Sequence, residues 1–169
     1  MARRTNGNCY FSVRKKLPEI FLAKSATMEL MHKTFYASGF LYHSPTQKIL
    51  LQQTTDHKDV PVTLFSCLCS HSNNPAEVFQ KLIIDILGIT IPLDSIKHVY
   101  DYIPEDGDKN HHVFYADVAE IANEESFTSK MNAEWYTTRQ ISKLKLPKQA
   151  DHNITIGQRV IRASFPQTQ

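Results

Sequence analysis

Apolar and polar positions follow a strand pattern over much of the chain. The apolar stretch FYASGFLYH at 35–43, the turn-like SPTQ and the stretch KILLQQ at 48–53 together predict a β-hairpin. A polar loop leads to VPVTLFSCLC at 60–69, which is rich in residues that favour strands. Two later segments, 95–103 and 111–118, alternate in polarity around the acidic turn PEDGDKN, so we expect two more strands there.

A short helix with clear boundaries is predicted at 75–87. Asn74 is suited to cap its N-terminus, and Pro75 fits the first helical position. Glu77 has the spacing of a capping box, and Gly88 stands where the helix would end. The interior is apolar on most sides, with Val78, Phe79, Leu82, Ile83, Ile84, Ile86 and Leu87. Such a helix needs apolar cover.

The remaining segments complete an α+β pattern. EWYT at 134–137 predicts a short strand, whereas TRQISKLKL and NITIGQRVIRAS predict two helices. We expect one principal mixed sheet packed between the helix near 75–87 and the C-terminal helix near 153–163, because both helices need apolar cover. Residues 34–169 are expected to form a single domain, preceded by a basic and partly ordered extension at 1–33.

Composition and charge narrow the class of protein. The chain has 169 residues, of which 41% are hydrophobic and 10% aromatic, enough for one folded core. Its net charge is +2, and MARR and VRKK place five basic residues within the first sixteen positions, as either a weak phosphate-attracting patch or a solvated chain end. The sequence has no apolar run of membrane-spanning length and no signal-peptide core, and three cysteines do not make a disulfide framework. A cytoplasmic protein without a membrane partner is expected.

The order of these elements and the stretch 67–89 resemble the Nudix hydrolase fold and its Nudix box. That box contains a glycine and a glutamate, and it ends in Arg-Glu-aliphatic-x-Glu-Glu-x-Gly-aliphatic. Gly88 and Ile89 match its last two positions, and Ile83 matches its first aliphatic position. Lys81 stands in place of the arginine. The frame of the box is therefore present.

The carboxylates of the box are mostly absent. Asp85 takes the first place of the glutamate pair, and Ile86 takes the second. Leu82 stands where the box has its other helical glutamate. Asn73 occupies the earlier glutamate position, and Cys67 occupies the glycine position. The resemblance is therefore to a degenerate Nudix box.

Two segments outside the box share the resemblance. ASGFLYHSPTQKILLQQ looks like the family's hairpin before the box, and AEWYTTRQISKL resembles the segment in which an acidic residue and a tryptophan precede a short helix. The similarity extends over about residues 34–163. It implies a Nudix-like mixed β-sheet sandwiched between helices.

The resemblance implies a metal site, but this helix carries few of the carboxylates that would form it. In an active Nudix enzyme the helical carboxylates hold Mg²⁺ or Mn²⁺ against a substrate diphosphate. The corresponding side of this helix reads Leu82, Asp85 and Ile86, of which only Asp85 can ligate a metal. The other interpretation of Asp85 is structural, because Glu77, Lys81 and Asp85 form an i, i+4 series typical of a solvated helix face.

A loop outside the box is the other source of carboxylates. The resemblance allows an extra catalytic carboxylate from Glu105, Asp106 or Asp108, so Asp85 and Glu105 are the catalytic candidates. The same residues around Gly107 also fit an ordinary exposed turn.

Cysteine and histidine residues allow a different metal hypothesis. Cys67, Cys69 and His71 recur at two-residue spacing on a predicted strand, and His57 or the pair His111–His112 offers a fourth ligand for zinc. Buried cysteines acting as small apolar residues explain the same pattern. A nucleophile made from Cys69 and a distant histidine has no local signature. His111 and His112 should point to opposite faces of their strand.

We interpret the chain as a degenerate Nudix-fold protein that binds a nucleotide, a nucleoside-diphosphate derivative or RNA with little or no hydrolysis. The candidates for ligand contact are one basic residue and four aromatic residues, which are suited either to base stacking or to the core. They are Lys81, Tyr42, Tyr102, Phe114 and Trp135. Tyr36 and Tyr100 are further aromatics of this kind. We expect either no cofactor or weakly bound Mg²⁺ or Mn²⁺.

Two alternatives stay open. One is a Mg²⁺-dependent Nudix hydrolase of a nucleoside diphosphate linked to another moiety, using Asp85 and the loop carboxylates. The other is a scaffold for protein contacts, for which an apolar box helix is suitable.

Overall fold

The computed structural model describes residues 34–53, 62–70, 74–105, 107–119 and 132–164. The chain divides into two units, Met1–Met31 and His32–Gln169, and all described residues belong to the second. The extension predicted at 1–33 therefore lies outside the described residues. No helix in the described ranges is long and apolar enough to cross a membrane.

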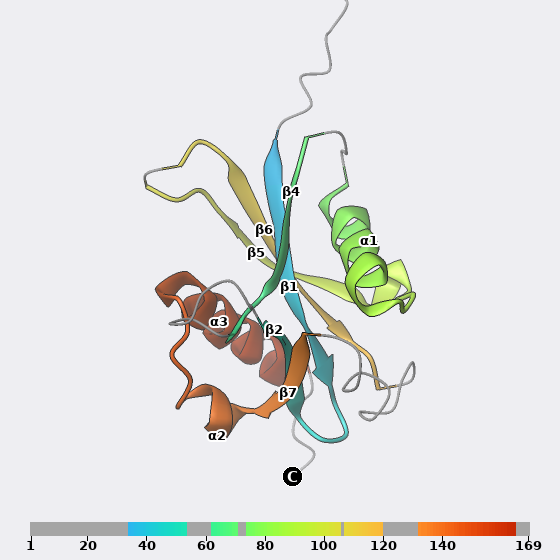
Figure 1. Ribbon diagram of the computed structural model, residues 1–169, viewed down its shortest axis with the longest axis vertical. Coiled ribbons are helices and arrows are strands. Elements are labelled where there is room, and N and C mark those ends of the chain that lie inside the picture. Colours follow the sequence, from blue (N-terminus) through green and yellow to red (C-terminus); the bar gives the residue numbers. More distant parts are fainter. Residues whose placement is uncertain (1–33, 54–61, 71–73, 106, 120–131, 165–169) are drawn as a thin grey trace, which may run out of the picture. The chain divides into compact units, whose positions relative to one another are not determined.

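One mixed sheet runs through the domain (Figure 1). Its strands in the described residues are β1 (Phe35–His43), β2 (Lys48–Gln53), β3 (Val62–Thr63), β4 (Phe65–Cys69), β5 (Ile96–Tyr102), β6 (Asn110–Asp117) and β7 (Ala133–Thr137). The main path is β3-β2-β1-β6-β5, with β4 added to β1 and β7 added to β2. β1 is parallel to β6 and antiparallel to β2 and β4. The predicted hairpin, the two alternating strands and the short strand before the last helices are confirmed.

The single strand predicted at 60–69 is wrong in one respect, because the structure divides it at Leu64. Thr63 pairs with Gln52 of β2, whereas Phe65 pairs with Gly39 of β1. The chain changes partner strands between these two pairs. Leu64 is buried at this crossing together with Val62 and Phe65, whereas Leu68 further along β4 is exposed.

α1 (Pro75–Leu87) begins and ends as predicted. The side-chain oxygen of Asn74 accepts a hydrogen bond from the Ala76 backbone N–H at 3.1 Å, and its amide nitrogen donates to the Glu77 carboxylate at 2.9 Å. At the other end, Gly88 adopts a φ of 68°, and its N–H donates to a carbonyl of the last turn at 2.8 Å. Local side-chain chemistry therefore sets both ends of the helix.

The buried side of α1 packs closely on β1. Phe79 and Ile83 are fully buried in this core. Gly39 on β1 lies beneath the ring of Phe79, since a Cβ added there would come within 2.8 Å of the ring atom Cζ. The ring also stacks on Phe114 of β6, with centroids 5.7 Å apart. The missing side chain at position 39 thus lets the helix approach the sheet.

α3 (Lys148–Ser164) covers the opposite face of the sheet (Figure 1). Ile154 and Ile161 of this helix are buried in a second core with Phe40 and Tyr115 of the sheet. The prediction of a sheet between two helices is therefore confirmed.

Two short helical segments lie beside these elements. η1 (Leu93–Ser95) is a 3₁₀ turn that precedes β5. α2 (Thr138–Ile141) is shorter than the helix predicted from TRQISKLKL. The N–H groups of Lys143 and Leu144 bond to carbonyls three residues earlier, at 2.9 and 3.0 Å, so the chain tightens and leaves α-helical geometry after one turn.

Candidate functional site

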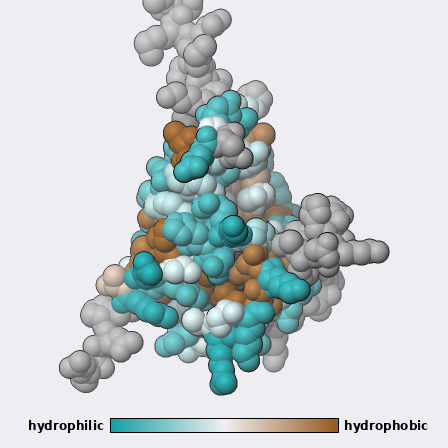
Figure 2. Space-filling view, turned by 90° about the vertical axis from the view of Figure 1, so that its left-hand side faces the viewer, coloured by the Kyte–Doolittle hydropathy of each residue, from teal (hydrophilic) through white to brown (hydrophobic). Residues whose placement is uncertain are grey.

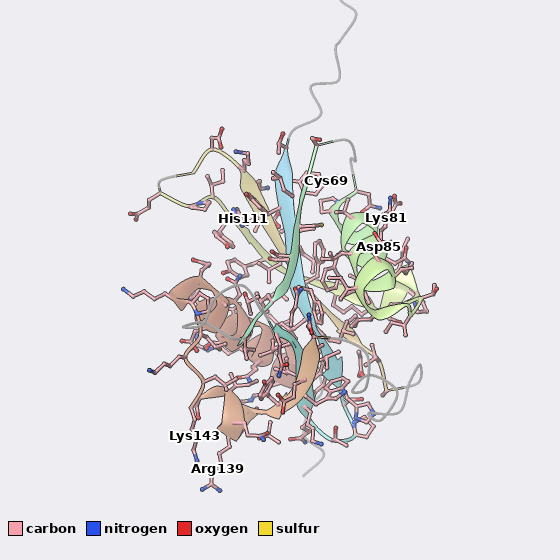
Figure 3. The ribbon with its side chains drawn as sticks, viewed as in Figure 1. Cys69, Lys81, Asp85, His111, Arg139 and Lys143 are labelled. Carbon is pink, nitrogen blue, oxygen red and sulfur yellow. The ribbon has the colours of Figure 1, made fainter. Side chains whose placement is uncertain are left out.

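The face of α1 that carries Leu82, Asp85 and Ile86, which the sequence resemblance aligns with the Nudix box, offers one carboxylate. Leu82 and Ile86 are half-buried and pack against the core, whereas Asp85 is exposed. Glu77 and Lys81 are exposed as well, so the i, i+4 series lies on a solvated face. Figure 3 shows Lys81 and Asp85 together on α1, away from His111, which lies across the sheet. This arrangement matches the structural interpretation of Asp85.

A magnesium site of several carboxylates does not fit these positions. Glu105 lies in the loop between β5 and β6, which is on the other side of the molecule from α1 in Figure 1. The one group of three or more ligating side chains in the described ranges contains neither Asp85 nor Glu105. Mg²⁺ requires oxygen ligands. The described part of this helix face supplies only the Asp85 carboxylate.

Asp85 does influence a neighbouring thiol. Burial raises the pKa of Cys67, and the nearby Cys69 and Asp85 raise it further. The carboxylate of α1 therefore lies close enough to β4 for its charge to reach Cys67. A thiol with a raised pKa remains protonated near neutral pH and is a poor nucleophile.

The cysteine–histidine zinc hypothesis finds no assembled site in the described residues. Cys67 and Cys69 lie on β4, on one edge of β1, whereas His111 and His112 lie on β6, on its other edge. Strand β1 separates the two pairs. His57 and His71 lie outside the described residues. As predicted, the two neighbouring histidines of β6 point to opposite faces, because His111 stacks on Tyr36 and His112 contacts Phe35.

A groove of about 210 Å³ lies on the α3 side of the sheet. Its walls come from strands β1, β3, β4, β5 and β6 and from the start of α3. Figure 2 shows the side of the molecule that carries α3 and the β5–β6 hairpin, where hydrophilic side chains separate smaller hydrophobic patches. Large continuous apolar patches mark protein interfaces. On this side of the described part of the chain, the hydrophobic patches are small and separate.

Aromatic rings form a continuous row along the groove. Tyr36 of β1 stacks on His111 of β6 with centroids 4.4 Å apart, and His111 stacks on Tyr102 of β5 at 4.7 Å. Tyr102 then stacks on Tyr100 at 5.5 Å. Tyr36, His111 and Tyr102 are direct cross-strand partners, so the sheet register positions the row.

Amide side chains of α3 complete the groove beside these rings. The Tyr100 hydroxyl donates to Oδ1 of Asn153 at 2.5 Å, and Nε2 of Gln149 donates to the same oxygen at 2.8 Å. Asn153 is 2% exposed, so a buried amide is held in place by two donors. Burial raises the pKa of both Tyr100 and Tyr102, so their hydroxyls stay protonated.

The surroundings of His111 favour the neutral form of its ring. Burial lowers the pKa of His111, and the neighbouring His112 lowers it further. A neutral imidazole stacks on its neighbours and keeps one donor and one acceptor nitrogen. The groove therefore combines flat apolar faces with hydrogen-bonding edges.

The predicted ligand contacts are distributed over several places. Tyr102 lines the groove. Tyr42 is half-buried on β1, where burial and the nearby Asp117 raise its pKa. Phe114 and Trp135 are buried in the core under α1, and the first of them packs on Phe79. Lys81 is exposed on α1, on the other side of the sheet from the groove.

Sequence reasoning missed Gln149 and Asn153 as groove residues. The signal was present, because Asn153 is a polar residue on the buried side of an amphipathic helix. An i, i+4 partner, Gln149, precedes it by one turn. A polar pair in such a position indicates either a satisfied buried amide or a binding surface.

No protein-family model matches the sequence, and no curated protein matches it significantly. Several solved structures, in contrast, are similar to the structure of this chain. NrtR from Shewanella oneidensis superposes with a TM-score of 0.60 at 13% identity, over 78% of this chain and 64% of that one. The Nudix domain of the same protein, solved in complex with ADP ribose, gives 0.55 at 15% identity, over 76% and 86%. A mutT/nudix family protein from Listeria innocua gives 0.58 at 13% identity, over 79% and 97%.

These similarities show that the domain has the Nudix fold. The chain covers just under two thirds of the length of full NrtR, and nearly all of the Listeria protein. The mixed sheet and the helices on its two faces are therefore those of a Nudix-like α+β domain.

Proposed function

We propose that this Nudix-fold domain binds a nucleotide-like ligand, a nucleoside-diphosphate derivative or a nucleotide of RNA, in the groove beside α3, with little or no hydrolysis. The observation that carries the proposal is the row of stacked rings, Tyr36, His111 and Tyr102, next to the amides of Gln149 and Asn153. Nucleobases are flat and carry donors and acceptors on their edges. The groove offers matching chemistry.

The size of the groove supports binding of one nucleoside portion. At about 210 Å³ it is smaller than the roughly 300–1,000 Å³ typical of pockets that enclose a whole ligand. A base and its sugar would occupy it, and the phosphates would extend outward. The ADP ribose held by the Nudix domain of NrtR has this composition, which supports a nucleoside-diphosphate derivative as the ligand class.

The composition of α1 supports binding without turnover. Hydrolysis of a diphosphate in this fold requires carboxylates that organise metal and water. Leu82 and Ile86 are packed against the core, and Asp85 is the one carboxylate among the three. We therefore favour a binding function over the hydrolase alternative. The hydrophilic side chains that separate the hydrophobic patches on this side likewise favour a small ligand over a protein scaffold.

Calorimetric titration of a nucleotide panel tests the proposal. The panel contains ADP ribose, a dinucleoside polyphosphate and a capped RNA oligonucleotide, in buffer with EDTA. We expect at least one ligand to bind the wild-type chain and to bind His111→Ala more weakly by roughly 5- to 150-fold, since loss of a base–aromatic stack costs about 1–3 kcal/mol.

The matched control is His98→Ala, which removes an exposed histidine from the opposite face of the same sheet. It should leave the affinity unchanged. Binding by none of the panel, or equal weakening by both variants, would contradict the proposal. Preference for the capped RNA over ADP ribose would identify RNA as the ligand class.

A further inference from the structure

Three potential metal ligands meet on β5 and β6, away from the groove. Nε2 of His98 lies 2.6 Å from Oδ1 of Asp101, and Nδ1 of His112 lies 2.8 Å from the same oxygen. The three ligating atoms all lie within 4.8 Å of one another. Two imidazole nitrogens thus lie beside one carboxylate oxygen, within reach of a single ion.

An irregularity in β5 creates this convergence. His98 and Asp101 are three residues apart, so a regular strand would direct their side chains to opposite faces. The register shifts between His98 and Tyr100, where His98 pairs with Phe114 and Tyr100 pairs with Val113. The extra residue brings His98 to the face of Asp101. Bulges of this kind often redirect a side chain at a functional site.

His112 joins them from the neighbouring strand. It is the direct cross-strand partner of Asp101, and its ring makes an edge contact with Phe35 at 5.2 Å. The ring of His98 similarly contacts Phe114 at 5.7 Å. Phe35 and Phe114 belong to the core under α1, so the three ligands lie on the face of the sheet opposite the groove.

We propose that His98, Asp101 and His112 bind one divalent transition-metal ion of the zinc class. Neutral imidazoles and a carboxylate are ligands that Zn²⁺ accepts, and three protein ligands leave a coordination position for water. The nitrogen donors distinguish this cluster from a Mg²⁺ site, which prefers oxygen ligands alone. The exposed positions of His98 and Asp101 let an ion enter from solvent.

The surroundings of His112 support a ligand role. Its second ring nitrogen, Nε2, lies 3.3 Å from the side-chain amide of Asn110. When Nδ1 binds a metal, Nε2 carries the proton and needs an acceptor. The amide oxygen of Asn110 provides one after a flip of the side chain, a partner of the kind that orients metal-binding histidines.

Cobalt(II) titration followed by visible absorption tests this site on the full chain, without an affinity tag and without nucleotide. We expect one equivalent of cobalt to give d–d bands that zinc abolishes by competition. Asp101→Asn and His112→Ala should each weaken binding at least tenfold. The matched control, His111→Ala, changes the adjacent histidine on the opposite face and should leave the titration unchanged.

His98→Ala provides a second test at a side chain that is 51% exposed, where folding is least affected. It should weaken cobalt binding as well. Circular dichroism of each variant establishes that the fold is retained. Absence of cobalt binding, or binding that survives the loss of His98 and Asp101, would overturn the proposal. The test uses no nucleotide, so its outcome is independent of the function of the groove.

Discussion

The rings of Tyr36 and His111 stack with centroids 4.4 Å apart and planes inclined by 22°. The whole of α1 and strands β2 to β5 lie between the two residues in the sequence, and the parallel pairing of β1 with β6 places them opposite each other. The start of the aromatic row is therefore fixed by the central pair of strands. A ligand that stacks on these rings would therefore find them already positioned, which would lower the entropic cost of binding.

Gly39→Ala should destabilise the domain through overpacking. A Cβ at this position would collide with the backbone carbonyl of Phe114 and come within 2.8 Å of Phe79 Cζ. Because the carbonyl belongs to a central strand, it cannot move aside, and we expect the free energy of unfolding to fall by about 2 kcal/mol. Urea unfolding measures the change.

Gly88→Ala provides the comparison for that experiment. Its added Cβ would meet nothing within 4 Å, but its φ of 68° is unfavourable for alanine. The expected cost is about 1 kcal/mol. Equal effects of the two substitutions would show that close approach at Gly39 is unimportant.

Leu82→Glu should be costly, whereas Asp85→Asn should not. Leu82 is half-buried and packs against the core, so a carboxylate there loses apolar contact and part of its hydration. We expect a loss of about 1–3 kcal/mol in unfolding free energy for Leu82→Glu, and a change within roughly 0.5 kcal/mol for the exposed Asp85→Asn. Chemical denaturation distinguishes them. A neutral effect of Leu82→Glu would indicate an open cleft on this side of α1.

The unmodified protein should show little or no turnover of nucleoside-diphosphate derivatives with Mg²⁺ or Mn²⁺. Two of the three positions that align with the box are apolar, so we expect most of the stabilisation of transition-state charge by metal and carboxylates to be missing. Phosphate and nucleotide release are measured by chromatography over the same panel that is used for binding. Robust hydrolysis that disappears in Asp85→Asn would support the hydrolase alternative instead.

Cys67 should react slowly with iodoacetamide in the native state. Burial, followed by Cys69 and Asp85, raises the pKa of its thiol, and only the thiolate attacks. At mildly alkaline pH the peptide carrying Cys67 should be alkylated more slowly than in urea, as measured by mass spectrometry. Asp85→Asn removes one negative charge and should increase the native rate.

The raised pKa of Cys67 also makes the stability of the domain depend on pH. The thiol of Cys67 has a higher pKa in the folded chain than in the unfolded chain, so its protonated form stabilises the folded state. This stabilisation is complete at pH values below the pKa of the thiol in the unfolded chain. That contribution is lost as the pH rises through the interval between the two values. A native alkylation rate equal to the rate in urea would contradict the burial of Cys67.

Local chemistry explains why much of the fold was predictable. The boundaries of α1 follow from Asn74, Pro75 and Gly88, whose effects act within one helical turn. The alternation of β5 and β6 and the opposite directions of His111 and His112 follow from the geometry of a strand. The resemblance then supplied the order in which these elements pack.

Long-range geometry explains what the sequence did not reveal. The groove depends on α3 placing Asn153 beside Tyr100, which is a contact between distant segments. The cluster of His98 and Asp101 depends on a bulge in β5 that alternation alone does not predict. Phe114 was a candidate for stacking or for the core, and it lies in the core because α1 covers the face of β6 that carries it.

NMR mapping of a bound ligand shows directly whether the groove is the binding site. Ring resonances of tyrosine and histidine are followed while ADP ribose, or the tightest ligand of the panel, is added to the full chain. Ring currents from a stacked base should shift Tyr36, Tyr102 and His111 and leave the amides of Leu82 and Asp85 in place. Shifts concentrated on Leu82 and Asp85, with the three rings unchanged, would contradict binding in the groove.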